Sequence, residues 1–154
     1  MSEPQETLSC TYYAKIRKPA SEVFDAVFRA EKLNGYFATG LASADLEPGT
    51  TVRWGFHDFP EMEPFPVKVI AVEPNRLIHL QWGSCIDGEW NDIKFTFEPE
   101  EEPDCTKITV TESGWPSSPK GIQGCVENSG GWANMIDSLK CYVERGFNLR
   151  EYMF

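Results

Sequence analysis

Apolar and polar residues alternate with a period of two in several short segments of the chain, which predicts β-strands with one buried face. The first such segment covers residues 7–17, with its apolar positions at Leu8, Cys10, Tyr12, Ala14 and Ile16. Turn signals rich in Gly, Pro and Asn separate the later strands, which we place at residues 52–57, 67–72, 77–82, 89–97 and 106–111. The Gly, Trp, Pro and Ser residues at 114–119 are expected to close the sheet.

A helical period appears in two parts of the chain. An apolar stripe at residues 23–28 predicts a short helix after the first strand, with Ser21 as its N-cap, and residues 32–40 predict a second short helical turn. In the last third, apolar residues recur at steps of three and four, which predicts a long helix that ends near Gly146. The stripe of this helix comprises Trp132, Met135, Ile136, Leu139, Val143 and Phe147.

This order of elements predicts an α+β domain in which the long helix lies across one face of an antiparallel sheet. The chain has 154 residues, of which 41% are hydrophobic, and this is enough to build a core without disulfides. We therefore expect one domain over residues 1–154, with an ordered core at about 7–149.

The net charge is strongly negative, at −10 from 14 basic and 24 acidic residues. This charge argues against nucleic-acid binding, which needs Lys and Arg to release counterions, and against docking on anionic lipids. Residues 98–104 carry five of the acidic side chains. We interpret this segment as a solvated turn, with an acidic docking segment as the alternative.

Signals for membranes, secretion and metals are weak. No apolar run reaches the roughly 18–20 residues of a membrane span, and the N-terminus lacks the features of a signal peptide, so we expect a cytoplasmic protein. The five cysteines form no C-x-x-C pair, which predicts free thiols. His57 and His79 are expected opposite the apolar face and lack companion ligand spacing, so we predict neither a metal site nor another cofactor.

Three segments carry a resemblance to a known family. Residues 14–24 (AKIRKPASEVF), 73–82 (EPNRLIHLQW) and 131–146 (GWANMIDSLKCYVERG) resemble the first strand and helix, the central hairpin and the closing helix of the family named for the activator of heat-shock protein 90 ATPase. This family is a branch of the START-like superfamily, also called SRPBCC. The family often has a tryptophan shortly after the first helix, where this chain has Tyr36 and Phe37.

The resemblance implies a helix-grip fold like that of birch-pollen-allergen-like proteins, in which a curved antiparallel sheet wraps around a long C-terminal helix. Members of the superfamily commonly enclose a hydrophobic cavity between the sheet and the helix, where they bind lipids, hormones or polyketides. Some carry out cyclase or dehydratase chemistry, and the named branch consists of co-chaperone modules.

The apolar side chains that should face the long helix have two interpretations. They are either simply core, or some of them line a cavity that takes a small molecule. The candidate ligand-binding residues are Trp54, Phe56, Ile78, Leu80, Trp82, Ile93, Phe95, Trp132, Met135, Ile136 and Leu139.

Two polar residues share the inward parity of these strands. Glu112 is either a proton-transfer carboxylate at the cavity mouth or, as the favoured alternative, a solvated strand end. Asn91 is a candidate polar group of the pocket. The sequence contains no G-x-S-x-G or H-E-x-x-H motif, so Glu112 and Asn91 are its only candidates for a catalytic role.

Two further features keep alternatives open. Gly130 and Gly131 either let the long helix approach the sheet or mark a break near its start. Phe59, Met62 and Phe65 in the proline-rich loop form an ordinary loop cluster, a lid over the pocket, or an exposed patch that recruits a partner.

The sequence therefore favours a domain that binds a hydrophobic or amphipathic small molecule, or a lipid, between the sheet and the C-terminal helix. A co-chaperone-type module that binds a chaperone or another protein is the alternative. A polyketide cyclase-like or dehydratase-like enzyme that uses Glu112 or Asn91 is a weaker one.

Overall fold

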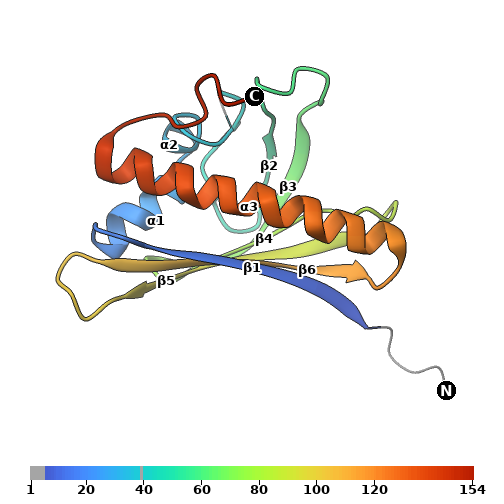
Figure 1. Ribbon diagram of the computed structural model, residues 1–154, viewed down its shortest axis with the longest axis horizontal. Coiled ribbons are helices and arrows are strands. Elements are labelled where there is room, and N and C mark those ends of the chain that lie inside the picture. The colour runs from blue at the N-terminus through green and yellow to red at the C-terminus, as the bar shows by residue number, and fades with distance from the viewer. Residues whose placement is uncertain (1–5, 39) are drawn as a thin grey trace.

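A six-stranded antiparallel sheet carries one long helix across one of its faces (Figure 1). The computed structural model describes residues 6–38 and 40–154. The strands are β1 (Thr7–Ile16), β2 (Thr51–Trp54), β3 (Phe65–Glu73), β4 (Leu77–Gly83), β5 (Trp90–Pro99) and β6 (Thr106–Pro116). The helices are α1 (Ala20–Phe28), α2 (Ala30–Leu33) and α3 (Pro119–Arg145). No helix in the described part of the chain is long and apolar enough to span a membrane.

The strands are ordered β1-β6-β5-β4-β3-β2, so that the first strand pairs with the last. Alternation of buried and exposed positions is clear in β5, where Ile93, Phe95 and Phe97 point inward. Because this alternation is what the sequence pattern predicts for a sheet covered on one face, the predicted α+β, helix-grip architecture is confirmed.

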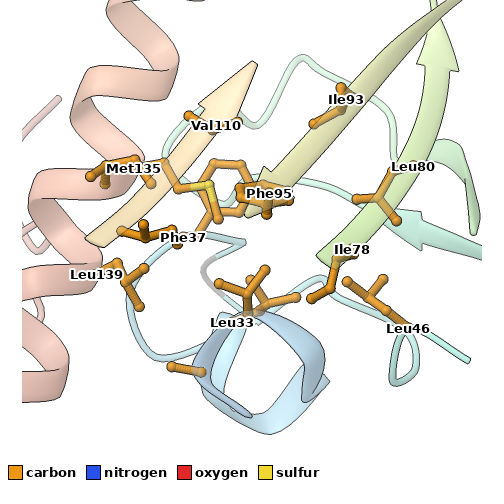
Figure 2. Packing of buried hydrophobic residues seen from close by; sticks show 14 of the residues in the cluster. Leu33, Phe37, Leu46, Ile78, Leu80, Ile93, Phe95, Val110, Met135 and Leu139 are labelled. Atoms are coloured by element: carbon orange, nitrogen blue, oxygen red, sulfur yellow. The ribbon is translucent and has the colours of Figure 1, made fainter. Parts of the chain in front are cut away.

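The apolar core lies between the sheet and the helices (Figure 2). Leu33 and Phe37 enter it from α2 and the segment that follows, and Met135 and Leu139 enter it from α3. Trp54 and Phe95 are among the largest fully buried side chains from the sheet.

Helix α1 begins differently from the prediction, because Ser21 does not cap it. Its N-cap is Pro19, and no side chain makes a capping hydrogen bond. The extended backbone of Pro19 (φ −59°, ψ 153°) places its carbonyl oxygen 3.0 Å from the Glu22 nitrogen. The helix therefore begins at Ala20, and Ser21 lies inside its first turn.

Strand β6 runs beyond the predicted end, through the segment that was expected to close the sheet. Its register against β1 shifts, since Leu8 pairs with Trp115 but Ser9 pairs with Ser113. The residue left over is Gly114, which has φ +118°. Gly114 is thus the extra residue of a β-bulge, and β6 stays paired with β1 on both sides of it. Trp115, which follows the bulge, is buried.

Helix α3 begins at Pro119, well before the apolar stripe that starts at Trp132. The Ser118 hydroxyl accepts a hydrogen bond from the Gly121 nitrogen, and Pro119 occupies the first turn. The helix ends at Gly146, which has φ +69° and donates to the Tyr142 carbonyl oxygen, as predicted for a glycine C-cap. Gly130 and Gly131 lie inside the helix, so they do not mark a break.

Candidate functional site

A cavity of about 1100 Å³ opens between the sheet, the first half of α3, the loop 55–64 and the C-terminal segment 147–154. Phenyl rings form the side near the two loops. They belong to Phe37, Phe56, Phe59, Phe65 and Phe154. The Phe59 and Phe154 rings lie 5.2 Å apart, so the loop and the C-terminal segment touch across the cavity edge.

Indole rings adjoin these phenyl rings, since Trp82 packs against Phe65 and Trp132 against Phe37, with centroids 5.6 and 6.3 Å apart. The rings of Trp82 on β4 and Trp132 on α3 are stacked, with centroids 5.0 Å apart and an interplanar angle of 22°. Trp90 at the start of β5 also lines the cavity. The lining is therefore rich in aromatic rings, which is typical of sites for apolar small molecules.

The buried carboxylate of Glu112 holds the two indoles in place. Its Oε2 accepts hydrogen bonds from Trp82 Nε1 (2.7 Å) and Asn91 Nδ2 (3.0 Å). Its Oε1 accepts from Trp132 Nε1 (2.8 Å) and Asn128 Nδ2 (3.0 Å). Both oxygens are used as acceptors by N–H donors, as suits an ionised carboxylate.

This geometry corrects the favoured interpretation of Glu112 as a solvated strand end, because the side chain is 0% exposed. The predicted inward parity is confirmed, but Glu112 and Asn91 lie behind the indoles and are not among the described residues that line the cavity. Since both carboxylate oxygens already accept two N–H bonds, the arrangement suits positioning of the tryptophans better than proton transfer to a ligand.

The other predicted ligand-binding residues divide into two groups. Phe56, Trp82 and Trp132 line the cavity. The rest pack in the core and are not among the described lining residues: Trp54, Ile78, Leu80, Ile93, Phe95, Met135, Ile136 and Leu139. Of the core group, Phe95 and Trp54 support the wall, since their rings pack edge-on against Trp132 and Trp82 respectively.

A buried ion pair joins the two segments at the cavity edge. Arg150, in the C-terminal segment, donates through Nε and Nη2 to Oδ2 of Asp58 in the loop 55–64. Their side chains are only 5% and 11% exposed. The guanidinium also lies over the Phe56 ring, 5.1 Å from its centroid. Arg150 itself lines the cavity, so the pair fixes one of its walls.

Phe59 and Met62 of the loop line the cavity, which favours the lid interpretation of this loop. Phe65 lines it as well, but it is the first residue of β3 and not part of the loop as predicted. Gly130 and Gly131 line it as well, and a Cβ atom built on either would meet no atom within 4 Å. The prediction that these glycines let the helix approach the sheet is therefore wrong. Their missing side chains leave space in the cavity.

The cavity mouth is acidic. Asp87 and Glu89 in the turn between β4 and β5 and Glu127 on α3 are exposed lining residues. Among the described lining residues, Arg150 is the basic one.

The histidines and cysteines lie outside this site. His79 on β4 contacts Asp92 Oδ1 at 2.6 Å, and neither residue lines the cavity. Burial raises the pKa of Asp92, but hydrogen bonds from Gln81 and His79 outweigh it and hold the pKa below its usual value. The described residues contain no cluster of three His, Cys, Asp or Glu that could hold a metal. All five cysteines are free, and burial raises the pKa of the Cys10 thiol.

Sequence reasoning missed the contribution of the C-terminal segment. Arg150 and Phe154 follow the end of α3 in a stretch without apolar period, so nothing in the pattern brings them to the cavity. Asn128 was missed because its part of α3 was not predicted to be helical. With the helix known, its position four residues before Trp132 would have placed both on one face.

Solved structures share this fold. The protein SSP2350 from Staphylococcus saprophyticus has a TM-score of 0.75 at 24% identity, covering 93% of this chain and 96% of that one. The Aha1 protein of Colwellia psychrerythraea, solved as a dimer, has a TM-score of 0.75 at 20% identity, covering 90% and 98%. DynU16, from the dynemicin biosynthetic locus, has a TM-score of 0.72 at 23% identity; 90% of this chain matches, spanning 48% of DynU16. At these identities the matches establish the fold.

The sequence gives a more specific assignment. No curated protein matches the chain. A family model described as "Activator of Hsp90 ATPase homolog 1-like protein" matches residues 17–144, which is most of the chain. This confirms the resemblance drawn from the three segments, and the chain belongs to the family of activator of Hsp90 ATPase homolog 1-like proteins.

Proposed function

We propose that this protein binds a hydrophobic or amphipathic small molecule in the cavity between the sheet, α3 and the C-terminal segment. The observation that carries the proposal is the cavity itself, about 1100 Å³ with a lining rich in aromatic rings. Ligand pockets in proteins commonly measure about 300–1,000 Å³, so this one is large enough for a drug-sized ligand.

The walls are held in place before any ligand arrives. Glu112 fixes the indoles of Trp82 and Trp132, and the Asp58–Arg150 pair fixes the loop against the C-terminal segment. A ligand gains about 25 cal/mol for each Å² of apolar surface that it buries, and fixed walls lower the ordering cost that offsets this gain.

The direct test is an NMR titration of ¹⁵N-labelled protein with a panel of sterols, fatty acids and aromatic polyketides. We expect saturable shifts of the indole N–H signals of Trp82, Trp90 and Trp132. Trp54 serves as the internal control, because its buried indole does not line the cavity and should shift less. A silent spectrum across the panel would overturn the proposal.

A filled cavity provides the second test. Gly131→Phe places a ring in the open space beside the wall, whereas Val126→Phe places the same ring on an exposed position of α3 that does not line the cavity. Both variants should fold, as circular dichroism would report. Only Gly131→Phe should weaken binding, by about tenfold or more if the ring displaces the ligand.

A protein-interaction module remains a second candidate, because the C-terminal end exposes apolar side chains. Phe147 is 57% exposed and Tyr152 is 98% exposed, and Phe154, which lines the cavity, is 66% exposed. Exposed apolar groups gathered at one place mark interaction surfaces in many proteins. Given the family, the test is whether the chain binds heat-shock protein 90 or changes its ATPase rate, and whether Phe147→Ser with Tyr152→Ser removes the effect.

A further inference from the structure

The charge buried behind the indole wall has no basic partner among its described hydrogen bonds. Glu112 is fully buried, and all four of its bonds come from neutral N–H groups of Trp82, Asn91, Asn128 and Trp132. The bonds spread the negative charge without cancelling it. In a low-dielectric interior such a charge acts over several ångströms, and here the cavity lies on the far side of the indoles.

The same bonds change the indoles themselves. An N–H that donates to a carboxylate is polarised, and the ring to which it belongs becomes richer in electrons. The faces of aromatic rings are already the negative part of their quadrupole, and tryptophan is the strongest partner of cations among them. Trp132 is only 3% exposed, because the rings of Trp82 and Phe37 stack against it. The electron-rich surface at the wall is therefore mainly that of Trp82, which is half-buried and lines the cavity.

The charges around the mouth act in the same direction. Asp87, Glu89 and Glu127 add carboxylates at the opening. The basic lining residue, Arg150, is already paired with Asp58. A second cation, Lys68, lies over the Trp90 ring, and its charge opposes this trend.

The protein's own cations show that other aromatic rings of the cavity lining accept positive charge. Lys68 Nζ lies 3.7 Å from the centroid of the Trp90 ring. The Arg150 guanidinium carbon lies 5.1 Å from the Phe56 ring and 5.4 Å from the Phe154 ring. All three rings line the cavity, and all three distances fall within the roughly 6 Å range of cation–π contacts.

We propose that the cavity selects amphipathic cations, in which a quaternary or protonated ammonium group is attached to an apolar body, over neutral or anionic ligands with the same apolar body. This inference rests on the proposed function and names the ligand class for that site. Glu112 acts in it as a positioning residue, through the indoles of Trp82 and Trp132.

The test uses three compounds with one apolar body: (2-naphthylmethyl)trimethylammonium, 2-(hydroxymethyl)naphthalene and 2-naphthylacetate. Affinities are measured by isothermal titration calorimetry at low and high salt, with indole N–H shifts as the site readout. We expect the cation to bind about tenfold or more tightly than the neutral alcohol, and the anion to bind most weakly. The contribution of the buried Glu112 to this preference should persist in high salt, whereas the contribution of the carboxylates at the mouth should be screened.

Three variants separate the sources of the preference. Glu112→Gln removes the buried charge at nearly constant size, and should reduce the preference for the cation at high salt several-fold. Glu127→Gln removes an exposed mouth charge and should reduce it at low salt only. Glu101→Gln makes the same charge change in the exposed turn between β5 and β6, away from the cavity, and should leave binding unchanged.

The outcomes keep the two proposals apart. Equal or weaker binding of the cation than of the neutral alcohol, or failure of the cation to bind while a panel ligand does, overturns the inference and leaves small-molecule binding standing. Failure of these compounds and of the whole panel overturns both. If Glu112→Gln does not fold, the wild-type ranking of the three compounds and the Glu127→Gln and Glu101→Gln pair still decide the question.

Discussion

Helix α3 contains four glycines, and a change of each to alanine would place the new methyl group in one of three different surroundings. A Cβ atom at Gly130 or Gly131 would meet nothing within 4 Å. At Gly124 it would lie 3.0 Å from Trp115 Nε1, and at Gly121 it would clash with the Pro116 carbonyl oxygen. None of the four has a positive φ, so alanine fits the backbone and the local space decides the outcome.

Glycine inside a helix costs about 1 kcal/mol relative to alanine. Gly130→Ala and Gly131→Ala should therefore each raise the unfolding free energy by about that amount, and the double variant by about 2 kcal/mol. At about 2–4 °C for each kcal/mol in a domain of this size, the double variant should melt about 4–8 °C higher. Gly124→Ala should gain less, because the Trp115 ring must give way. Gly121→Ala should lower the unfolding free energy by about 1–3 kcal/mol, because its methyl group would clash with the backbone of Pro116.

Urea unfolding followed by circular dichroism measures these changes, provided that the slope of the free energy against urea stays the same among the variants. Ligand-free protein is needed, since Gly130 and Gly131 line the cavity. The reasoning is refuted if the alanines at 130 and 131 are neutral or destabilising. It is refuted equally if Gly121→Ala is as stable as Gly130→Ala.

Two further predictions concern charged groups. Arg150→Ala leaves the buried Asp58 carboxylate without its partner and should lower the unfolding free energy by about 3–5 kcal/mol, while Asp58→Ala combined with Arg150→Met should lose clearly less; equal losses in the urea midpoint would contradict this. Asp92 has a pKa below its usual value, so its stabilising contribution is present above the unfolded pKa of about 3.9 and is lost as the pH falls through the lower, folded value. Asp92→Asn should be less stable than the wild type at pH 7, and the difference should shrink in acid titrations below about pH 4; a gap that stays constant with pH would show that the charge is not its cause.

The parts of the fold that pack against the core were predictable from the sequence. The alternation in the strands and the stripe from Trp132 to Leu139 exist because one face of each element is buried and the other is not. Even the inward direction of Glu112 followed from this parity. Its environment did not, because the donors come from two other strands and from α3.

The parts that border the cavity were not predictable in this way. The first half of α3 has small and polar residues such as Asn128, Gly130 and Gly131, because one side of it faces the cavity and another faces solvent. Neither side requires an apolar stripe, so the helical period of apolar residues is absent in the part of α3 that lines the cavity. The Asp58–Arg150 pair joins residues far apart in sequence, and no local pattern encodes such a contact.

The pairing of β1 with β6 bears on how this chain reaches its folded state. The two strands pair from Thr7 to Ile16, with one bulge at Gly114, and the hydroxyls of Thr11 and Thr111 hydrogen-bond at 3.0 Å. A contact between such distant residues requires closure of a long loop, and folding rates fall as such non-local contacts come to dominate. During synthesis β1 leaves the ribosome first and pairs almost last. Its apolar face stays uncovered until residues 106–145 have followed, and this interval is when the nascent chain is most exposed to aggregation.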